Sequence, residues 1–300
     1  MAEITYERSP EERVHWVRSI PFFALHLVPL AAIFTGVAFG DWVLALVLFW
    51  VRMFFITGGY HRYFAHRTFK LNRFWQFVFA FGAQTSVQKG VLWWSGFHRH
   101  HHRFSDMEED VHSPRKGFWW SHVGWILCRK YHASRYDLIP DFAKFPELRF
   151  LDRNPSLPPA LLAIAVFLIG GWSALLIGFV LSTVVLWHAT FTINSLAHVF
   201  GRIRYRTTDT SRNSLILALL TLGEGWHNNH HHFQAAARQG FFWWEIDVTF
   251  YVLKAMSWVG IVKDLKPVPP RARFAGRIKD ESPQPAITDP VHVGPMPDSI

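Results

Sequence analysis

The sequence predicts an all-α integral membrane protein: four transmembrane helices arranged as two hairpins, with a cytoplasmic helical cap that holds a histidine-rich metal site. Half of the 300 residues are hydrophobic and 17% are aromatic, which is too apolar for an ordinary soluble domain of this length. The apolar residues gather in long runs, and nine of the eighteen histidines lie directly after such runs. One membrane domain with polar ends explains both observations.

The first two apolar runs predict one helical hairpin. They cover about 21–40 and 42–60, and each approaches the ~20 residues that a helix needs to cross ~30 Å of hydrocarbon. Gly40 and Asp41 interrupt the apolar residues, and so short an interruption requires the two helices to fold back on each other. We therefore place the first turn at residues 40 and 41.

A second hairpin is predicted from spans of about 158–173 and 174–196, with Gly170 and Gly171 in the turn region. Residues 1–20 are polar and lack a signal-peptide cleavage pattern, which predicts a cytoplasmic N-terminal segment. The membrane domain then covers 21–266. The Pro-rich, charged residues 267–300 are expected to form a disordered tail.

The distribution of positive charge predicts the orientation in the membrane. The N-terminus, the 61–157 segment and the 197–300 segment all lie on the side opposite the two short turns. Lys and Arg are concentrated on that side, so the positive-inside rule makes both termini and the nine histidines cytoplasmic, in the inner membrane if the source is prokaryotic. The formal charge of +9 raises the question of nucleic acid, but no basic run is interleaved in a soluble fold, and we expect no nucleic-acid partner.

Three further features bound the prediction. The single cysteine, Cys128, excludes disulfides, a thiolate-bound iron–sulfur cluster and a four-cysteine zinc site. Phe74–Trp94 is apolar but contains several amides, which favours a helix at the membrane interface over a span. The aromatic stretches at 118–125 and 241–244 resemble interfacial anchors.

Helical geometry decides which histidines can act together. Residues at i, i+3 and i+4 share one face of a helix, whereas i+2 points roughly 200° away at ~100° per residue. The clusters at 98–102 and 227–231 each place three histidines on one face in this way. His100 and His232 point away from the shared faces. His61 and His66 follow the second span, and Asn194 and His198 form an i, i+4 pair at the end of the fourth. The selected residues are His61, His66, His98, His101, His102, His198, His227, His230, His231 and Asn194.

Nine imidazoles are too many for one metal ion that must keep positions open for chemistry, so two metals with four or five histidines each fit the count better. Asn194 is suited to hold a metal-bound water. All-nitrogen ligation without a bridging carboxylate fits iron, whereas zinc is normally content with three or four ligands. Copper stays open at this stage.

The motifs that carry these residues resemble a known family. HRYFAH, FHRHHHRFSD, TINSLAHVFG and GEGWHNNHHHF, with GFWWSHVGWILCRK between them, are similar to the membrane-bound acyl-CoA desaturases of the stearoyl-CoA Δ9 type from about Thr57 to Lys263. The resemblance implies that the nine histidines and Asn194 hold two iron ions. It also implies insertion of a cis double bond, at Δ9, into a long-chain saturated acyl-CoA.

The same resemblance implies a substrate tunnel. Gln88, Trp94 and Thr190 match positions that line its bend, and Phe49 and Met53 match positions near its closed end. Arg115 and Lys116 match a basic pair that meets the CoA phosphates. One departure affects the carrier, because the family's Arg-Asp before the second histidine cluster is Gly96-Phe97 here. This departure speaks against the family's mode of CoA binding. Acyl-CoA remains the first choice of substrate because of the overall resemblance, followed by carrier-protein-bound or phospholipid-bound acyl chains.

The chemistry defines the remaining partners. An unactivated CH2–CH2 unit has no acidic proton and no leaving group, so its oxidation requires O2 and two electrons at the metal centre. The chain has no dinucleotide fingerprint, cysteine cluster or appended haem domain, which implies a ferredoxin or cytochrome b5-like donor with its reductase. A basic surface suits an acidic donor.

Two other functions compete with desaturation. The same metals can serve hydroxylation of an alkane or lipid chain, which the histidines do not distinguish from desaturation. Metal transport is disfavoured, since transporters place their ligands inside the spans and the second and third clusters lie outside them.

Overall fold

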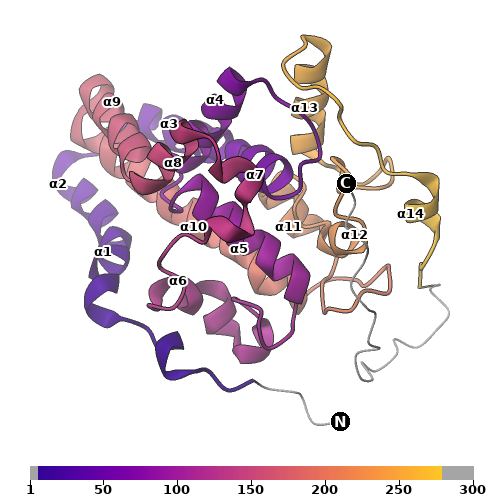
Figure 1. Cartoon of the computed structure of the whole chain (residues 1–300). Helices are drawn as coiled ribbons and strands as arrows, with labels where there is room; N and C mark the ends of the chain where they lie inside the picture. Colours follow the sequence, from indigo (N-terminus) through magenta and orange to yellow (C-terminus); the bar gives the residue numbers. More distant parts are fainter. Residues whose placement is uncertain (1–5, 279–300) are drawn as a thin grey trace.

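The computed structural model describes residues 6–278, and all its regular elements are helices (Figure 1). Three helical segments are long and apolar enough to cross a membrane: Trp16–Thr35, Phe39–Ala65 and Leu157–His198. The first comprises α1 (Trp16–Leu27), η2 (Val28–Ala31) and α2 (Ala32–Thr35), and the second comprises α3 (Phe39–Phe54) and the π-helical η3 (Phe55–Ala65). The third comprises α9 (Leu157–Ser173), the π-helical η7 (Ala174–Leu181), α10 (Ser182–Asn194) and η8 (Leu196–His198).

The third segment contains both spans of the second predicted hairpin. It is 42 residues long, and Gly171 interrupts it with φ 67° and ψ −158°, a conformation that glycine adopts without steric cost. Val166 packs in one apolar cluster with Phe179 and Val180, which a straight helix would hold far apart. The helix is therefore interrupted at Gly171, one of the two glycines predicted for the turn region.

The first turn lies four residues earlier than predicted. The chain breaks at Gly36, which has φ 70°, and α3 begins at Phe39, so Gly40 and Asp41 belong to its first turn. The Asp41 carboxylate accepts a hydrogen bond from the backbone N–H of Ala38 at 2.8 Å. An aspartate in the first turn stabilises a helix by capping its free N–H groups and by favourable interaction with the dipole. The prediction was wrong because it treated Asp41 as a helix breaker.

The predicted interfacial helix over 74–94 is two helices. α4 (Arg73–Gln84) and α5 (Val91–Phe104) are separated by a bend in which Val87 and Lys89 have φ of 59° and 64°. Phe79 of α4 is fully buried in the main apolar cluster, so α4 is part of the core. The amides of this stretch bond within the protein: Gln84, for example, donates to the Leu151 carbonyl at 3.1 Å, and Gln76 accepts from the Tyr63 hydroxyl at 3.0 Å.

Shorter elements complete the fold around these helices (Figure 1). They are η1 (Pro10–Glu12), η4 (Pro114–Lys116), η5 (Trp120–Gly124), α6 (Trp125–Leu127), η6 (Tyr136–Leu138), α7 (Pro140–Ala143), α8 (Pro146–Arg153), α11 (Leu215–Leu220), α12 (His227–His232), α13 (Val248–Trp258) and α14 (Pro270–Phe274). Each of the two aromatic stretches expected to act as interfacial anchors has both exposed and buried side chains. Trp119 and Trp243 are exposed, whereas Trp120 and Phe241 are buried in the protein.

The first part of the predicted tail is folded. α14 packs through Ala272 against Tyr205 and Phe241, so the first residues of the predicted 267–300 tail are folded. Apolar burial of Ala272 and the hydrogen bond from the Tyr205 hydroxyl to the Arg273 carbonyl, at 2.8 Å, hold this helix. The rest of the predicted tail, 279–300, lies outside the described residues.

Candidate metal centre and its cavity

The first histidine pair is aligned by π-helical geometry. Five residues of an α-helix rotate the side chain about 140° away from the starting direction, because each residue turns it by ~100°. In η3 the backbone N–H of His66 instead donates to the His61 carbonyl at 3.1 Å, an i to i+5 bond that closes a wider turn. The wider turn brings His61 and His66 to the same side.

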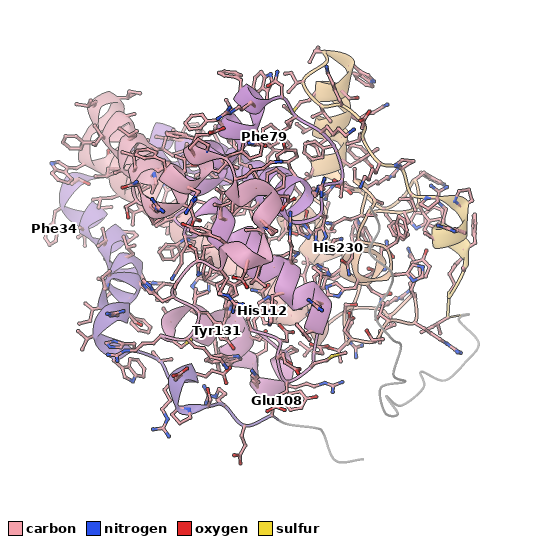
Figure 2. All side chains as sticks on the ribbon, viewed as in Figure 1. Phe34, Phe79, Glu108, His112, Tyr131 and His230 are labelled. Atoms are coloured by element: carbon pink, nitrogen blue, oxygen red, sulfur yellow. The ribbon has the colours of Figure 1, made fainter. Side chains whose placement is uncertain are left out.

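The remaining histidines come from three other elements. α5 supplies His98, His101 and His102, α12 supplies His227, His230 and His231, and η8 supplies His198. The two excluded neighbours bond elsewhere: His100 Nε2 to the Glu109 carbonyl at 2.9 Å, and His232 Nε2 to the Ala272 carbonyl at 3.0 Å. Figure 2 shows His230 in the interior, whereas Phe34 points outward from α2.

The nine histidines form two groups in which the candidate ligand atoms lie within 4.8 Å of one another. The first group contains five of them, namely His61, His66, His98, His102 and His230, and the second contains His101, His198, His227 and His231. The structure thus gathers all nine predicted ligands and divides them five and four.

The distances within the five-histidine group fit a metal ion. His102 Nε2 lies 3.0 Å from His98 Nε2 and 3.0 Å from His230 Nε2, and the His61–His230 and His66–His98 pairs are equally spaced. Nitrogen ligands at about 2.1 Å from a metal are about 3.0 Å apart when they subtend a right angle. Five nitrogens with this spacing match an octahedral arrangement that keeps one position open.

Buried carboxylates fix the direction of the imidazoles. His101 Nδ1 donates to Asp110 at 3.0 Å, His231 Nδ1 to Asp209 at 2.6 Å and His198 Nδ1 to Asp106 at 3.3 Å. Glu224 contacts His61 Nδ1 in the same way. Each carboxylate places the proton on Nδ1 and leaves the Nε2 lone pair directed into the group, which is the usual outer sphere of a histidine–metal site. His231 Nε2 is buried without a hydrogen-bond partner, as expected of a ligand atom.

The electrostatics keep four of the imidazoles neutral and keep Asp209 charged. Burial, reinforced by the neighbouring imidazoles, holds the pKa of His98, His102, His227 and His230 well below the usual value. Burial alone would raise the pKa of Asp209, but His231 and His198 and its hydrogen bonds hold it below its usual range. Neutral imidazole is the form that binds a metal, so these four histidines are ready for ligation near neutral pH.

Replacing Asp209 with asparagine tests this outer sphere. Asp209→Asn removes the negative charge behind His231 while keeping the size of the side chain, and losing such a partner lowers metal affinity about 10- to 100-fold. We expect a loss in that range, measured by competition for iron with a chelator of known affinity. Asp137→Asn, at an exposed aspartate that bonds to Arg135, should leave the affinity unchanged. Equal affinities of the two variants would contradict the role of Asp209.

An apolar cavity of about 270 Å³ leads to the histidines. It is lined by α1, the 87–89 bend, α5, α6 and α10, and it reaches His98 and Asn194. A second cavity, of about 40 Å³, shares Trp94, His98, Thr190 and Asn194 with the first and adds Met53, His61 and His227. The two cavities therefore meet beside ligands of both histidine groups.

Of the predicted tunnel residues, Trp94 and Thr190 line both cavities, Gln88 lines only the first and Met53 only the second, and Phe49 lines neither. Gln88 donates to Thr190 Oγ1 at 3.1 Å, and the Trp94 indole N–H donates to the Gln88 carbonyl oxygen at 3.2 Å. Met53 lines the inner cavity, whereas Phe49 packs in the buried cluster behind it. Hydrogen bonds thus join Gln88, Trp94 and Thr190 on the cavity wall, and Met53 lies at the inner cavity.

Two residues of η5 hold the helix end that carries Asn194. Ser121 Oγ donates to the Asn194 carbonyl, and His122 Nδ1 lies 2.9 Å from Ser195 Oγ. His122 Nε2 is 3.0 Å from His188 Nδ1, and His188 Nε2 is 2.9 Å from His26 Nε2 of α1. Ser121 and His122 thus connect η5 to the C-terminal part of α10 through hydrogen bonds.

The predicted head-group pair is placed differently from the expectation. Lys116 is buried, and its ammonium group is 3.0 Å from the Glu12 carboxylate, so it is not available to an external phosphate. Neither Arg115 nor Lys116 lines the cavity described above. Gly96 and Phe97, which replace the family's Arg-Asp, lie buried, and Gly96 packs against the backbone at Arg135.

The cavity has a different basic mouth. An adjoining hollow of about 140 Å³ shares Lys89, Ile126 and Leu127 with the cavity and adds Arg18 and Arg129. Burial lowers the pKa of Lys89 to about 8. The mouth therefore presents positive charge at the entrance of an apolar channel, which suits an anionic head group with an acyl chain.

Sequence reasoning missed the carboxylates Asp106, Asp110, Asp209 and Glu224. Asp106 and Asp110 lie within ten residues of the second histidine cluster, and Glu224 lies three residues before His227. This closeness in the sequence could have indicated these three carboxylates as partners of the histidines. Asp209 has no such neighbour in the sequence. His112 was also left out, and it lies with His101 and Asp110 in a third potential ligand group and lines the cavity.

Comparison with known proteins shows clear relatives. Residues 18–256 match the family model described as fatty acid desaturase. The chain is 36% identical over 285 residues to an sn-1 stearoyl-lipid 9-desaturase of Synechocystis, covering 92% of this chain and 87% of the relative. It is 38% identical over 268 residues to an acyl-CoA 5-desaturase of Anemone leveillei, covering 85% and 83%. An sn-2 palmitoyl-lipid 9-desaturase of Nostoc is 33% identical over 282 residues, covering 91% and 98%.

Proposed function

The chain belongs to the fatty acid desaturase family, and from this premise we propose that it inserts a cis double bond into a long saturated acyl chain at a di-iron centre. The observation that carries the proposal is the pair of apolar cavities that meet at Trp94, His98, Thr190 and Asn194 and together reach both histidine groups. The reaction balances as R–CH2–CH2–R′ + O2 + 2e⁻ + 2H⁺ → R–CH=CH–R′ + 2H2O. Two irons bound by the nine histidines would supply the oxidising power for this reaction.

The residues around the metals would position the chain. Gln88, Trp94 and Thr190 would bend it so that a cis arrangement fits, and Asn194 would hold a water beside one metal. The distance from the mouth to this bend would set the position of the double bond, which we propose is Δ9, as in the Synechocystis and Nostoc relatives. Four membrane crossings in two hairpins, with the histidines and both termini on the cytoplasmic side, complete the proposal.

Product analysis tests the reaction. Purified protein with iron, O2 and a ferredoxin and reductase system would receive the same stearoyl chain as acyl-CoA and as phospholipid, and the lipids would be read by mass spectrometry. A product two hydrogens lighter from either carrier supports desaturation. A product heavier by one oxygen atom would identify a hydroxylase instead, and no oxidised product from either carrier would overturn the proposal.

Met53 provides a prediction on chain length. Met53→Ala would empty the inner end of the cavity, which Met53 now occupies with 1% of its surface exposed. We expect the preferred acyl chain to lengthen by about two carbons, since the removed side chain is a few methylenes long, with a rise of severalfold in the ratio of C20 to C18 product. Phe49→Ala serves as the comparison, because Phe49 packs behind Met53 and does not line the cavity. It should change this ratio less. An unchanged ratio in Met53→Ala would remove Met53 from the end of the tunnel.

We propose that the electron donor docks on a polar hollow of about 390 Å³ over the centre. This hollow is lined by His102 and His231, one from each histidine group, and by Arg103 and Arg206. Both arginines are exposed, so they are available to an acidic carrier.

Charge reversal tests this docking site. Arg103→Glu with Arg206→Glu should raise the KM for an acidic ferredoxin about tenfold at low salt, and the difference should shrink as salt screens the charges. Turnover driven by a small chemical reductant should change less than twofold. Lys254→Glu, on α13, is the matched control. A KM that does not respond to the arginines would place the donor elsewhere.

A further inference from the structure

The first helix forms one wall of the acyl cavity along its length. Arg18 of α1 lines the basic mouth, and Phe22 and Leu25 line the apolar cavity, all on one face at a spacing of three to four residues. This face is polar at the mouth and apolar further in, which matches an amphiphile that lies along it.

The same helix lies at the periphery of the protein. The most apolar window of the Trp16–Thr35 segment is 11% buried within the protein, against 28% and 22% for the other two candidate spans. Figure 1 shows α1 and α2 at the outer edge of the molecule. Phe22 stacks on Trp187 at 5.2 Å and His26 bonds to His188 at 2.9 Å, which ties α1 to α10. The outer face of this wall is therefore the face that a bilayer would cover.

A second hollow lies on the other side of this wall. It measures about 160 Å³ and is lined by α9, η7 and α10, through Ala160, Ala163, Phe179 and Val184 among others. Its lining is almost entirely apolar and comes largely from the candidate membrane spans. A groove of this composition on spanning helices is a surface for lipid acyl chains.

Leu25 and Val87 line both hollows, so these two side chains separate the groove from the acyl cavity. Val87 has φ 59°, a conformation that is rare for a β-branched residue. This conformation belongs to the bend that also places Gln88 in the cavity. The partition therefore consists of two partly buried side chains that each face both hollows, and one of them is on the peripheral helix α1.

We propose that an acyl chain still attached to a membrane glycerolipid enters the cavity sideways from the bilayer, between Leu25 and Val87. The proposal rests on the proposed function, which places an acyl chain in this cavity. A glycerolipid has a second chain, and entry through the water-facing mouth would draw that chain out of the bilayer into water. A side entrance leaves the second chain in the membrane while the head group stays at Arg18, Lys89 and Arg129.

Photolabelling tests the route independently of turnover. The full chain in vesicles of phosphatidylglycerol would be exposed to phosphatidylglycerol that carries a diazirine in one acyl chain, and in parallel to an acyl-CoA with the same diazirine chain. After illumination, mass spectrometry would measure the label on the peptides that contain Trp94 and Thr190, inside the cavity. Leu25→Trp narrows the passage, Leu25→Ala widens it, and Leu27→Trp adds the same bulk on the exposed face of α1.

We expect the phospholipid to label the cavity of the unaltered protein. Labelling should fall about tenfold in Leu25→Trp, rise about threefold in Leu25→Ala and stay within twofold in Leu27→Trp. Because Leu25 also lines the cavity itself, labelling by acyl-CoA should fall in Leu25→Trp too, but by a clearly smaller factor. The route is overturned by absence of cavity labelling by phospholipid, by equal loss for both probes in Leu25→Trp, or by no response to either Leu25 variant. The proposed desaturation would fail in a different way, namely labelling of the cavity without any unsaturated product.

Discussion

Replacing His230 with alanine is expected to abolish turnover, with a loss of at least about a thousandfold, and to lower the iron bound per chain. His230 Nε2 lies 3.0 Å from the Nε2 atoms of both His61 and His102, so it occupies a central place in the five-histidine group. Its removal leaves a ligand position that no neighbouring side chain can fill. Lost metal removes the oxidising centre as a whole, which explains the size of the expected effect. Metal analysis of the purified protein and product analysis measure the two quantities.

The control is two residues away on the same helix. His232 Nε2 bonds to the Ala272 carbonyl, and His232 stacks on Tyr205, away from both groups. His232→Ala should keep the iron content and most of the turnover. Full iron content in His230→Ala would remove this residue from the metal site, whatever happens to activity.

Replacing Arg62 with leucine is expected to destabilise the fold by about 3–5 kcal/mol, the range for breaking a buried ion pair and leaving its partner charged. Arg62 is 1% exposed and pairs with Glu224 at 3.0 Å and with Asp247 at 2.9 Å. It also donates to the Ala237 carbonyl at 2.8 Å. Leucine would leave two buried carboxylates without their cation. Unfolding by heat or denaturant, with the protein in detergent, measures the change.

Arg67→Leu supplies the comparison for this substitution. Arg67 is largely exposed and lies 3.6 Å from Asp141, so its ion pair is worth about 0–1 kcal/mol. Similar stabilities of the Arg62 and Arg67 variants would show that the buried cluster does not hold the fold. Because Glu224 also contacts His61, Arg62→Leu should weaken iron binding as well.

The elements that sequence predicted well are those set by local periodicity. The i, i+3, i+4 pattern placed three histidines of α5 and three of α12 on common faces, and the structure brings those faces together. The interruption of the long apolar segment at Gly171 followed from a glycine pair inside an apolar run. Both are properties of a few neighbouring residues, so a sequence alone expresses them.

The features that sequence did not predict depend on contacts between distant segments. Asp209 meets His231 only after the 199–214 segment has folded over α12, and no local pattern indicates it. The sequence predicted Lys116 as a head-group ligand, but in the structure Lys116 pairs with Glu12, which lies more than a hundred residues earlier in the chain. The turn at Gly36 was misplaced for another reason, since an aspartate within an apolar run either breaks a helix or caps one, and only the backbone geometry distinguishes the two.

The way the ligands are distributed along the chain has a consequence for the cell. They come from four separate stretches between residues 61 and 231, so no unfolded chain presents the complete set, and bound metal stabilises the folded state selectively. Without metal, closely spaced ring nitrogens that face one another in each group, such as His231 Nε2, remain buried without a bonding partner. If the proposed irons are bound, scarcity of iron should reduce the lifetime of the protein as well as its activity, because chains made without it would open more often and be removed by proteases.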